Sequence, residues 1–157
     1  MVVESDADAA WMARALEEAR RAEAHDDVPI GALVVAADGT VLAAAHNERE
    51  LREDPTAHAE VLALRAAAAR LGSWRVLEAT LYVTLEPCTM CAGAIVLARV
   101  PRVVYGCTDP KAGAAGSVLD LLAVPALNHR PEVVGGVLAE ACAEELRAFF
   151  RARRGAR

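Results

Sequence analysis

One histidine and two cysteines between residues 58 and 91 restrict what this chain can fold into, because their side chains suit a single metal ion. The histidine is His58, with Glu60 two residues later, and the cysteines lie in the segment Pro87-Cys88-Thr89-Met90-Cys91. A catalytic zinc takes three protein ligands and keeps its fourth position for water. Glu60 can move the protons of that water. The pattern therefore predicts a hydrolytic Zn²⁺ site, one ion per chain, with ligands His58, Cys88 and Cys91 and with Glu60 as the catalytic proton carrier.

Other roles are possible for parts of this pattern. A Cys-x-x-Cys pair alone is also typical of a redox dithiol or of half of a structural zinc site. A redox pair leaves His58 and Glu60 without a role, and a structural zinc needs a fourth ligand. Glu60 as the capping-box partner of Thr56 would need a spacing of three, and the spacing is four. The fourth-ligand candidates, none of them in a second paired motif, are Cys107, Cys142, His46 and His129.

The predicted chemistry is hydrolytic deamination of an amino-substituted heterocycle. A catalytic zinc lowers the pKa of its water to about 7, which makes hydroxide available at neutral pH. Glu60 would take the water proton and deliver protons to a ring nitrogen and to the departing amine. A peptidase is disfavoured because the His-Glu-x-x-His pair is absent.

Length and composition favour one domain over residues 1–157, with no membrane association. A chain of 157 residues can bury a substantial core without disulfides. The first residues lack the basic and apolar regions of a secretory signal. The apolar run from Cys91 to Ala98 is far too short to span a bilayer. We expect a cytoplasmic protein whose four cysteines are metal ligands or free thiols.

Positive charge gathers at the C-terminus of a chain whose formal net charge is −5. From Arg147 onward there are five arginines, at positions 147, 151, 153, 154 and 157, and no acidic residue. A local basic tail on an acidic body suits an oriented contact with an anionic partner. An exposed helix end gives the same pattern, because arginine also interacts favourably with the negative end of a helix.

The order of predicted elements indicates an α/β fold, a three-layer α/β/α sandwich. Strand–helix–strand units in the second half imply parallel neighbours, whereas Asp38-Gly39 predicts an antiparallel first hairpin. We expect a mixed five-stranded sheet with helices on both faces. The predicted helices span 8–25, 58–71, 88–99, 117–122 (capped by Ser117) and 139–153. The predicted strands span 30–35, 41–45, 80–85, 102–107 and 131–138, and residues 47–55 and 110–116 are expected to be loops.

The motifs resemble the cytidine and deoxycytidylate deaminase superfamily, and the wider sequence resembles its bacterial tRNA-specific adenosine deaminases over nearly the whole chain. The segment His58-x-Glu60 with Pro87-Cys88-x-x-Cys91 is similar to the zinc signature of the superfamily. The most discriminating similarities are the loop of residues 109–117 and the closing Phe149-Phe150-Arg151 segment. Further similar stretches are residues 28–32, 54–60, 80–95, 102–106 and 128–130.

The resemblance implies a cytidine deaminase-like fold, a homodimer, and conversion of adenosine to inosine at the wobble position of an arginine tRNA anticodon. It implies that Asn47 binds the purine edge, that Val28 and Pro29 line the base pocket, and that Asp109 contacts the nucleotide sugar. From its charge, Lys111 could meet phosphate, although a solvated loop lysine is an equal interpretation. Residues expected to contact RNA are Phe149, Arg151, Arg153 and Arg154, with at least one of Phe149 and Phe150 expected to be core packing.

Two other functions remain open at this point. The first is a deaminase of a free base or nucleoside, of the guanine or cytosine type. The second is a zinc-stabilised RNA-binding module without catalysis, which would need four protein ligands. The tRNA function is favoured over both, because the unpaired bases of an anticodon loop can reach a buried metal.

Overall fold

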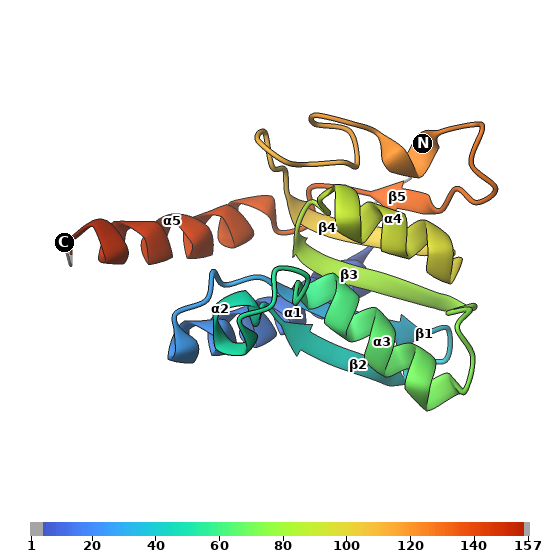
Figure 1. Cartoon of the computed structure of the whole chain (residues 1–157), viewed down its shortest axis with the longest axis horizontal. Helices are drawn as coiled ribbons and strands as arrows, with labels where there is room; N and C mark the ends of the chain where they lie inside the picture. Colours follow the sequence, from blue (N-terminus) through green and yellow to red (C-terminus); the bar gives the residue numbers. More distant parts are fainter. Residues whose placement is uncertain (1–4, 156–157) are drawn as a thin grey trace.

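Five strands hydrogen-bond side by side in the order β2-β1-β3-β4-β5, and helices cover both faces of the sheet (Figure 1). The structure is a computed structural model and describes residues 5–155. Strand β1 is antiparallel to β2 and β3, whereas β3, β4 and β5 run parallel. The predicted mixed sheet with its antiparallel first hairpin is therefore confirmed. The strands are β1 (Gly31–Ala36), β2 (Val41–His46), β3 (Ala79–Leu85), β4 (Arg102–Cys107) and β5 (Glu132–Val134).

Helices α3 and α4 lie on one face of this sheet, and α1 and α5 lie on the other (Figure 1). The three-layer prediction is confirmed. The helices are α1 (Asp6–Arg20), α2 (Arg49–Arg52), α3 (Ala59–Leu71), α4 (Thr89–Ala98) and α5 (Ala139–Gly155), with 3₁₀ turns at Arg21–His25 and Leu121–Ala123. Met1 to Glu4 and Arg157, on which the signal-peptide and arginine-tail predictions partly rest, lie outside the described residues.

The alternation of side chains along the strands creates two hydrophobic cores, one under each pair of helices. Successive strand residues point to opposite faces, so Ala32 and Val34 of β1 pack toward α3 and α4, whereas Leu33 and Val35 pack toward α1 and α5. Burial on both faces explains why the central strands are continuous apolar runs in the sequence.

Helix α1 lies unusually close to β1, and a glycine makes this approach possible. A Cβ atom at Gly31 would lie 2.1 Å from the carbonyl oxygen of Ala15 and 2.5 Å from the backbone nitrogen of Ala19. Real Cβ contacts are not this short, so any side chain at position 31 would push α1 away from the sheet. The helix packs its buried Met12, Ala15 and Leu16 into the second core.

Three sequence predictions of secondary structure are wrong in detail. The expected loop of residues 47–55 contains the short helix α2, whose first-turn amides Glu50 N and Leu51 N donate to the Asp27 carboxylate. The predicted helix at 117–122 is absent from the described chain, which has a 3₁₀ turn at Leu121–Ala123 instead. Ser117 caps no helix, because its hydroxyl donates to Glu86. Strand β5 is shorter than expected and ends before Gly135-Gly136.

Within residues 5–155, no helix combines the length and the apolar character that a membrane crossing requires.

Candidate active site

The three predicted metal ligands meet where two helices begin. His58 is the N-cap of α3 and Cys88 is the N-cap of α4, and both have extended backbone conformations. Cys91 lies in the first turn of α4, one helical turn after Cys88. Because an N-cap side chain leaves the helix axis differently from the residues that follow it, His58 and Glu60 can approach one point although they are two residues apart.

The distances between the ligand atoms fit a tetrahedral zinc ion. His58 Nδ1 lies 3.5 Å from the sulfur of Cys88 and 3.5 Å from the sulfur of Cys91. Zinc–sulfur and zinc–nitrogen bonds of about 2.3 and 2.0–2.1 Å at a tetrahedral angle give a nitrogen–sulfur separation of about 3.5 Å. Among the described residues, these three form the one group of metal-ligating side chains whose donor atoms all lie within 4.8 Å of one another.

The remaining thiols and imidazoles serve other contacts. Cys107 and Cys142 are buried among hydrophobic residues, as free thiols. His46 Nδ1 lies 2.8 Å from the Glu18 carboxylate, and His129 Nε2 lies 2.6 Å from the carbonyl oxygen of Val100. The candidates for a fourth ligand are thus absent from the cluster, which leaves the three-ligand composition of a catalytic zinc.

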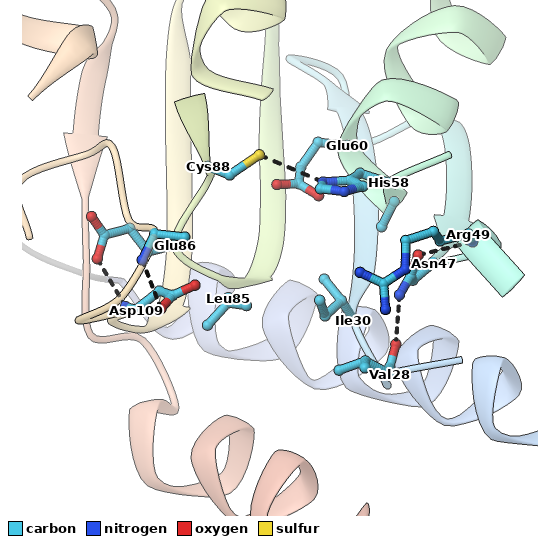
Figure 2. A pocket seen from close by; sticks show the side chains of 12 residues that line it. Val28, Ile30, Asn47, Arg49, His58, Glu60, Leu85, Glu86, Cys88 and Asp109 are labelled. Carbon is cyan, nitrogen blue, oxygen red and sulfur yellow. Dashed lines mark hydrogen bonds between the residues drawn. The ribbon is translucent and has the colours of Figure 1, made fainter. Parts of the chain in front are cut away.

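Glu60 is buried beside the ligands, with only 4% of its surface exposed (Figure 2). Burial raises the pKa of its carboxyl group to about 7, so the group can exchange a proton near neutral pH. The capping-box alternative is excluded by geometry. His58, not Thr56, is the N-cap of α3, and the Thr56 hydroxyl donates to Asp54.

The protonation of the two cysteines is unequal in the absence of a cation. Hydrogen bonds from Cys91 and His58 stabilise the Cys88 thiolate and lower the pKa of Cys88 to about 4. The Cys88 thiolate, together with burial, raises the pKa of Cys91 well above its usual range. A pair that already carries one thiolate is prepared for a divalent cation, whose charge favours deprotonation of the second thiol.

A cavity opens from the ligand cluster to the surface, and several predicted substrate residues line it (Figure 2). Val28, Asn47 and Asp109 are in its wall, and their contacts with the base and the sugar stay predictions. Two other predicted residues are not in the wall: Pro29 is buried outside the lining, and Lys111 is exposed on another face of its loop. The lining residues are Val28, Ile30, Asn47, Arg49, His58, Ala59, Glu60, Leu85, Glu86, Cys88, Asp109 and Ala112.

The Asn47 side chain is held in one orientation by the backbone around it. Its Nδ2 donates to the carbonyl oxygen of Val28 at 3.3 Å, and its Oδ1 accepts from the Arg49 amide at 3.1 Å. An amide side chain has two N–H donors and two acceptor lone pairs. Asn47 therefore keeps one donor and one acceptor for a partner in the cavity.

Sequence reasoning did not find several lining residues, including Arg49 and Glu86. Glu86 directly precedes the Pro87-Cys88 motif, and Arg49 follows Asn47 by two positions, so proximity to a motif was the available signal. Ile30, Leu85 and Ala112 carry no chemical signal, because an apolar pocket wall resembles ordinary core sequence.

The two phenylalanines of α5 have different environments. Phe149 is buried, with 8% of its surface exposed, and packs edge-on against Phe150, which is 43% exposed. The expectation that at least one is core packing is confirmed by Phe149. Arg153 lies over the Phe149 ring and pairs with Asp26 at 3.0 Å. The Arg153 side chain therefore helps to hold the end of α5 against the segment that contains Asp26.

A hollow with basic residues in its wall lies between α5 and the loop of residues 109–117, and Phe150 forms part of this wall. Lys111 contributes to it from that loop, and Arg154 from the last turn of α5, which projects beyond the sheet (Figure 1). Arg151 lines the same hollow and pairs with Glu144 at 2.6 Å. The arrangement brings together cationic side chains and an exposed aromatic ring, which are the groups that bind single-stranded nucleic acid.

Comparison with known proteins shows which family the sequence and the fold of this chain match. The profile of the MafB19-like deaminases matches residues 6–154. A tRNA-specific adenosine deaminase of Bacillus subtilis (strain 168) is 51% identical over 144 residues, which are 92% of this chain and 89% of that protein. A solved structure from work on A-to-I editing by tRNA:A34 deaminases at the wobble position of transfer RNA is 47% identical. It superimposes with a TM-score of 0.83 over 87% of this chain and 99% of its own.

A deaminase of a free base is a more distant match. The X-ray structure of a guanine deaminase from Bacillus subtilis is 33% identical, with a TM-score of 0.62 over 93% of this chain and 92% of its own. The fold is thus shared with free-base deaminases, whereas sequence identity is higher to the proteins that act on tRNA.

Proposed function

Because the chain belongs to the tRNA-specific adenosine deaminases of the MafB19-like deaminase family, we propose that it converts adenosine to inosine at the wobble position of a tRNA anticodon. The reaction is a zinc-dependent hydrolysis that replaces the exocyclic amine of adenine with a carbonyl oxygen. One observation carries the chemistry: His58 Nδ1 lies 3.5 Å from two cysteine sulfurs, beside the buried carboxyl group of Glu60.

The residues divide the chemical work between them. His58, Cys88 and Cys91 would hold the zinc, which supplies the Lewis acid that makes water nucleophilic near neutral pH. Glu60 would take one proton from the attacking water and deliver it to the adenine ring nitrogen. It would then take the remaining proton from the added hydroxyl group and deliver it to the amino group, which leaves as ammonia. Burial raises the pKa of Glu60, which suits a group that both takes up and releases protons.

Recognition of the base falls to the cavity wall. Asn47 presents its remaining donor and acceptor to the purine edge, and Val28 contributes apolar surface against the ring. Asp109 lies on the opposite side of the cavity, where the sugar of an inserted nucleotide would pass (Figure 2). Pro29 is buried and lies outside the cavity lining, so it has no part in this recognition.

The surface around the cavity entrance supports RNA as the partner. An anticodon loop presents unpaired bases, so the target adenosine can leave its stack at modest energetic cost. Lys111, Arg151, Arg153 and Arg154 supply positive charge beside the cavity, and Phe150 supplies an exposed ring. We propose an arginine tRNA as the substrate, a homodimer as the working form and the cytoplasm as the compartment. A predicted contact of Phe149 with RNA would need its buried ring to open toward the surface.

Inosine mapping on total tRNA, after incubation with the purified zinc-loaded protein, tests the function. We expect inosine at position 34 of a tRNA and at no other adenosine of that molecule. Free guanine and free adenosine, offered in the same assay, separate the tRNA function from a free-base or nucleoside deaminase. Turnover of free guanine with no inosine in tRNA would overturn the proposal.

An RNA-binding module stabilised by a structural zinc is the remaining alternative. It requires four protein ligands, whereas the cluster offers three. Metal-site spectroscopy that detects a fourth protein ligand would contradict a catalytic zinc.

A further inference from the structure

The side chain of Glu86 is a buried carboxylate that the deamination chemistry above does not use. It lies between β3 and the metal-binding Cys88, is only 2% exposed, and forms part of the cavity wall. A buried carboxylate is costly unless it is paired or well hydrogen-bonded. Its partners therefore indicate what it is for.

The donors that bind this carboxylate all come from the 109–117 loop. Oε1 accepts from the Asp109 amide at 3.0 Å and from the Ser117 hydroxyl. Oε2 accepts from the amides of Ala115 and Ser117 at 3.0 and 3.1 Å. Four donors on one carboxylate, from the beginning and the end of the loop, close the loop around a single side chain.

The loop is shaped to surround this carboxylate. A Cβ atom at Gly113 would lie 2.4 Å from the carboxyl carbon of Glu86, so the loop passes close enough to exclude any side chain there. The backbone adds to the attachment, because Glu86 N donates to Cys107 O at 2.9 Å and Ala114 N donates to Pro87 O at 2.8 Å. The loop is thus attached to the same short segment that carries the first cysteine ligand.

The residues that the loop brings to the cavity are Asp109 and Ala112. Asp109 is bound to Glu86 through its own amide, and its carboxylate accepts from the amides of Lys111 and Ala112. The position of both lining residues therefore depends on where the Glu86 carboxylate lies. Glu86 is connected to the substrate wall of the cavity by its hydrogen bonds to the loop, and to the metal ligands because Cys88 follows it by two residues.

We propose that Glu86 is a positioning residue for the reaction: by binding four donors of the 109–117 loop, it holds Asp109 and Ala112 against the substrate at a fixed distance from the metal ligands. The inference rests on the proposed deamination of tRNA. It adds a residue whose carboxylate oxygens bind the 109–117 loop, and that acts on substrate binding through this loop.

Glutamine is the informative replacement because it keeps the shape of the side chain. Its amide nitrogen must replace one of the two carboxylate oxygens, and each oxygen accepts from at least one backbone N–H. At least one backbone donor then faces another donor and loses its partner. The loop should loosen while the buried shape of the site is kept.

Steady-state kinetics on an anticodon stem-loop test the proposal. For Glu86→Gln we expect a KM raised about tenfold, the effect of one lost hydrogen bond in a buried site, with kcat changed less than KM and with full zinc content. Ser117→Ala removes one donor and should give a smaller change in the same direction, and Ser117→Thr, which keeps the hydroxyl, should restore KM. Ser73→Ala is a matched control, because Ser73 accepts from a backbone amide in a turn elsewhere.

Two further measurements distinguish positioning from a general loss of structure. In a double-mutant cycle, Asp109→Ala should cost much less in the Glu86→Gln background than in the parent protein, since both act through one loop. Amide hydrogen exchange should accelerate at Asp109, Ala115 and Ser117, and not at Cys88 or Cys91.

The outcomes separate this inference from the proposed function. A parent protein without deaminase activity on tRNA would overturn the function itself. An active parent with an unchanged KM in Glu86→Gln and Ser117→Ala would overturn the positioning role alone. Independent effects of Glu86→Gln and Asp109→Ala, multiplying in the double variant, would do the same.

Discussion

The Asp8 carboxylate accepts two parallel hydrogen bonds from the Arg102 guanidinium, at 2.8 and 2.7 Å, and so ties the first turn of α1 to strand β4. Asp8 also accepts from the Tyr82 hydroxyl at 2.8 Å and from the Ser5 amide in the capping box of α1. The Asp8 carboxylate is only 2% exposed. An ion pair at this depth, with all its hydrogen bonds made, is expensive to break from one side.

The stability of the protein should therefore depend on the ionisation of Asp8. Hydrogen bonds from Arg102 lower the pKa of Asp8 to about 2, against 3.8 for an unperturbed aspartate. The folded state thus prefers the ionised form, so the stabilisation is complete above about pH 4 and is lost as the pH falls toward 2. It amounts to about 2 kcal/mol.

Denaturant unfolding of the parent and of Asp8→Asn at several pH values measures this contribution. The variant should be less stable at pH 7, and the difference should shrink between pH 4 and pH 2. Asp6→Asn, an exposed change in the same helical turn, is the control and should have little effect. A difference that stays constant with pH would contradict the assigned ionisation.

Replacement of Glu60 should separate metal binding from catalysis. Glu60→Ala removes the proton carrier but none of the three ligands, so zinc content should stay at one ion per chain. The deamination rate should fall by a factor of about 10² to 10⁴. Metal analysis and inosine formation on the same preparation check both statements. Full activity in a folded Glu60→Ala protein would refute the assigned mechanism.

Removal of one cysteine ligand should abolish zinc binding as well as activity, in contrast to the replacement of Glu60. Cys88→Ala should lose zinc and activity together, whereas Cys107→Ala, a change to another free cysteine, should keep both. Chelation of the parent protein should abolish activity, and added Zn²⁺ should restore it. Because the two hydrophobic cores lie beneath the helices, the secondary structure should persist without metal, which circular dichroism would show.

The two phenylalanines of α5 should respond differently to truncation. Phe149→Ala creates a cavity under the helix and should cost about 3 kcal/mol of stability. Phe150→Ala should leave stability nearly unchanged and weaken binding of the anticodon stem-loop by about 1–3 kcal/mol, the value of one base–aromatic stack. Weaker RNA binding in a stable Phe149→Ala protein, with none in Phe150→Ala, would reverse the assignment.

Charge at the end of α5 should appear in the salt dependence of RNA binding. Removal of residues 151–157 should weaken binding and flatten the plot of log affinity against log salt, by about 0.7 for each phosphate that the protein no longer neutralises. Arg154→Ala should account for one such phosphate, and Arg20→Ala, which changes a cation paired with Glu145, is the control. An unchanged slope in the truncated protein would place the RNA elsewhere.

Spacing and periodicity predicted the sheet and the metal site because both depend on local rules. The strand faces follow from alternation, and His58, Cys88 and Cys91 follow from ligand chemistry. The predicted helix at 117–122 failed because a tertiary contact overrides propensity there. The Ser117 hydroxyl binds Glu86, 31 positions away in the chain, and no local pattern contains that partner.

The choice between Phe149 and Phe150, and the presence of Arg49 and Glu86 in the cavity wall, could not be predicted for a similar reason. Phe149 and Phe150 are neighbours near the end of α5 and point to different sides of this helix. Which side faces the protein interior depends on how α5 packs against the sheet, and the local sequence does not contain this information. A glutamate before a metal motif has many possible partners. The cavity wall is assembled from separate segments of the chain, and only the folded arrangement shows which side chains reach it.

The metal ligands lie at the first residues of two helices, with His58 and Cys88 as the N-caps of α3 and α4 and Cys91 in the first turn of α4, and this links zinc affinity to the interior of the protein. The two helices contact each other and lean on the same face of the sheet through small side chains, among them Ala63 and Ala92. A larger side chain at that seam would shift one helix along or away from the other, and would spread the nitrogen and sulfur atoms at their ends. Zinc affinity should therefore fall when the packing between α3 and α4 is disturbed, even at a site far from the ion. A variant destabilised in this way would lose its zinc before it unfolded.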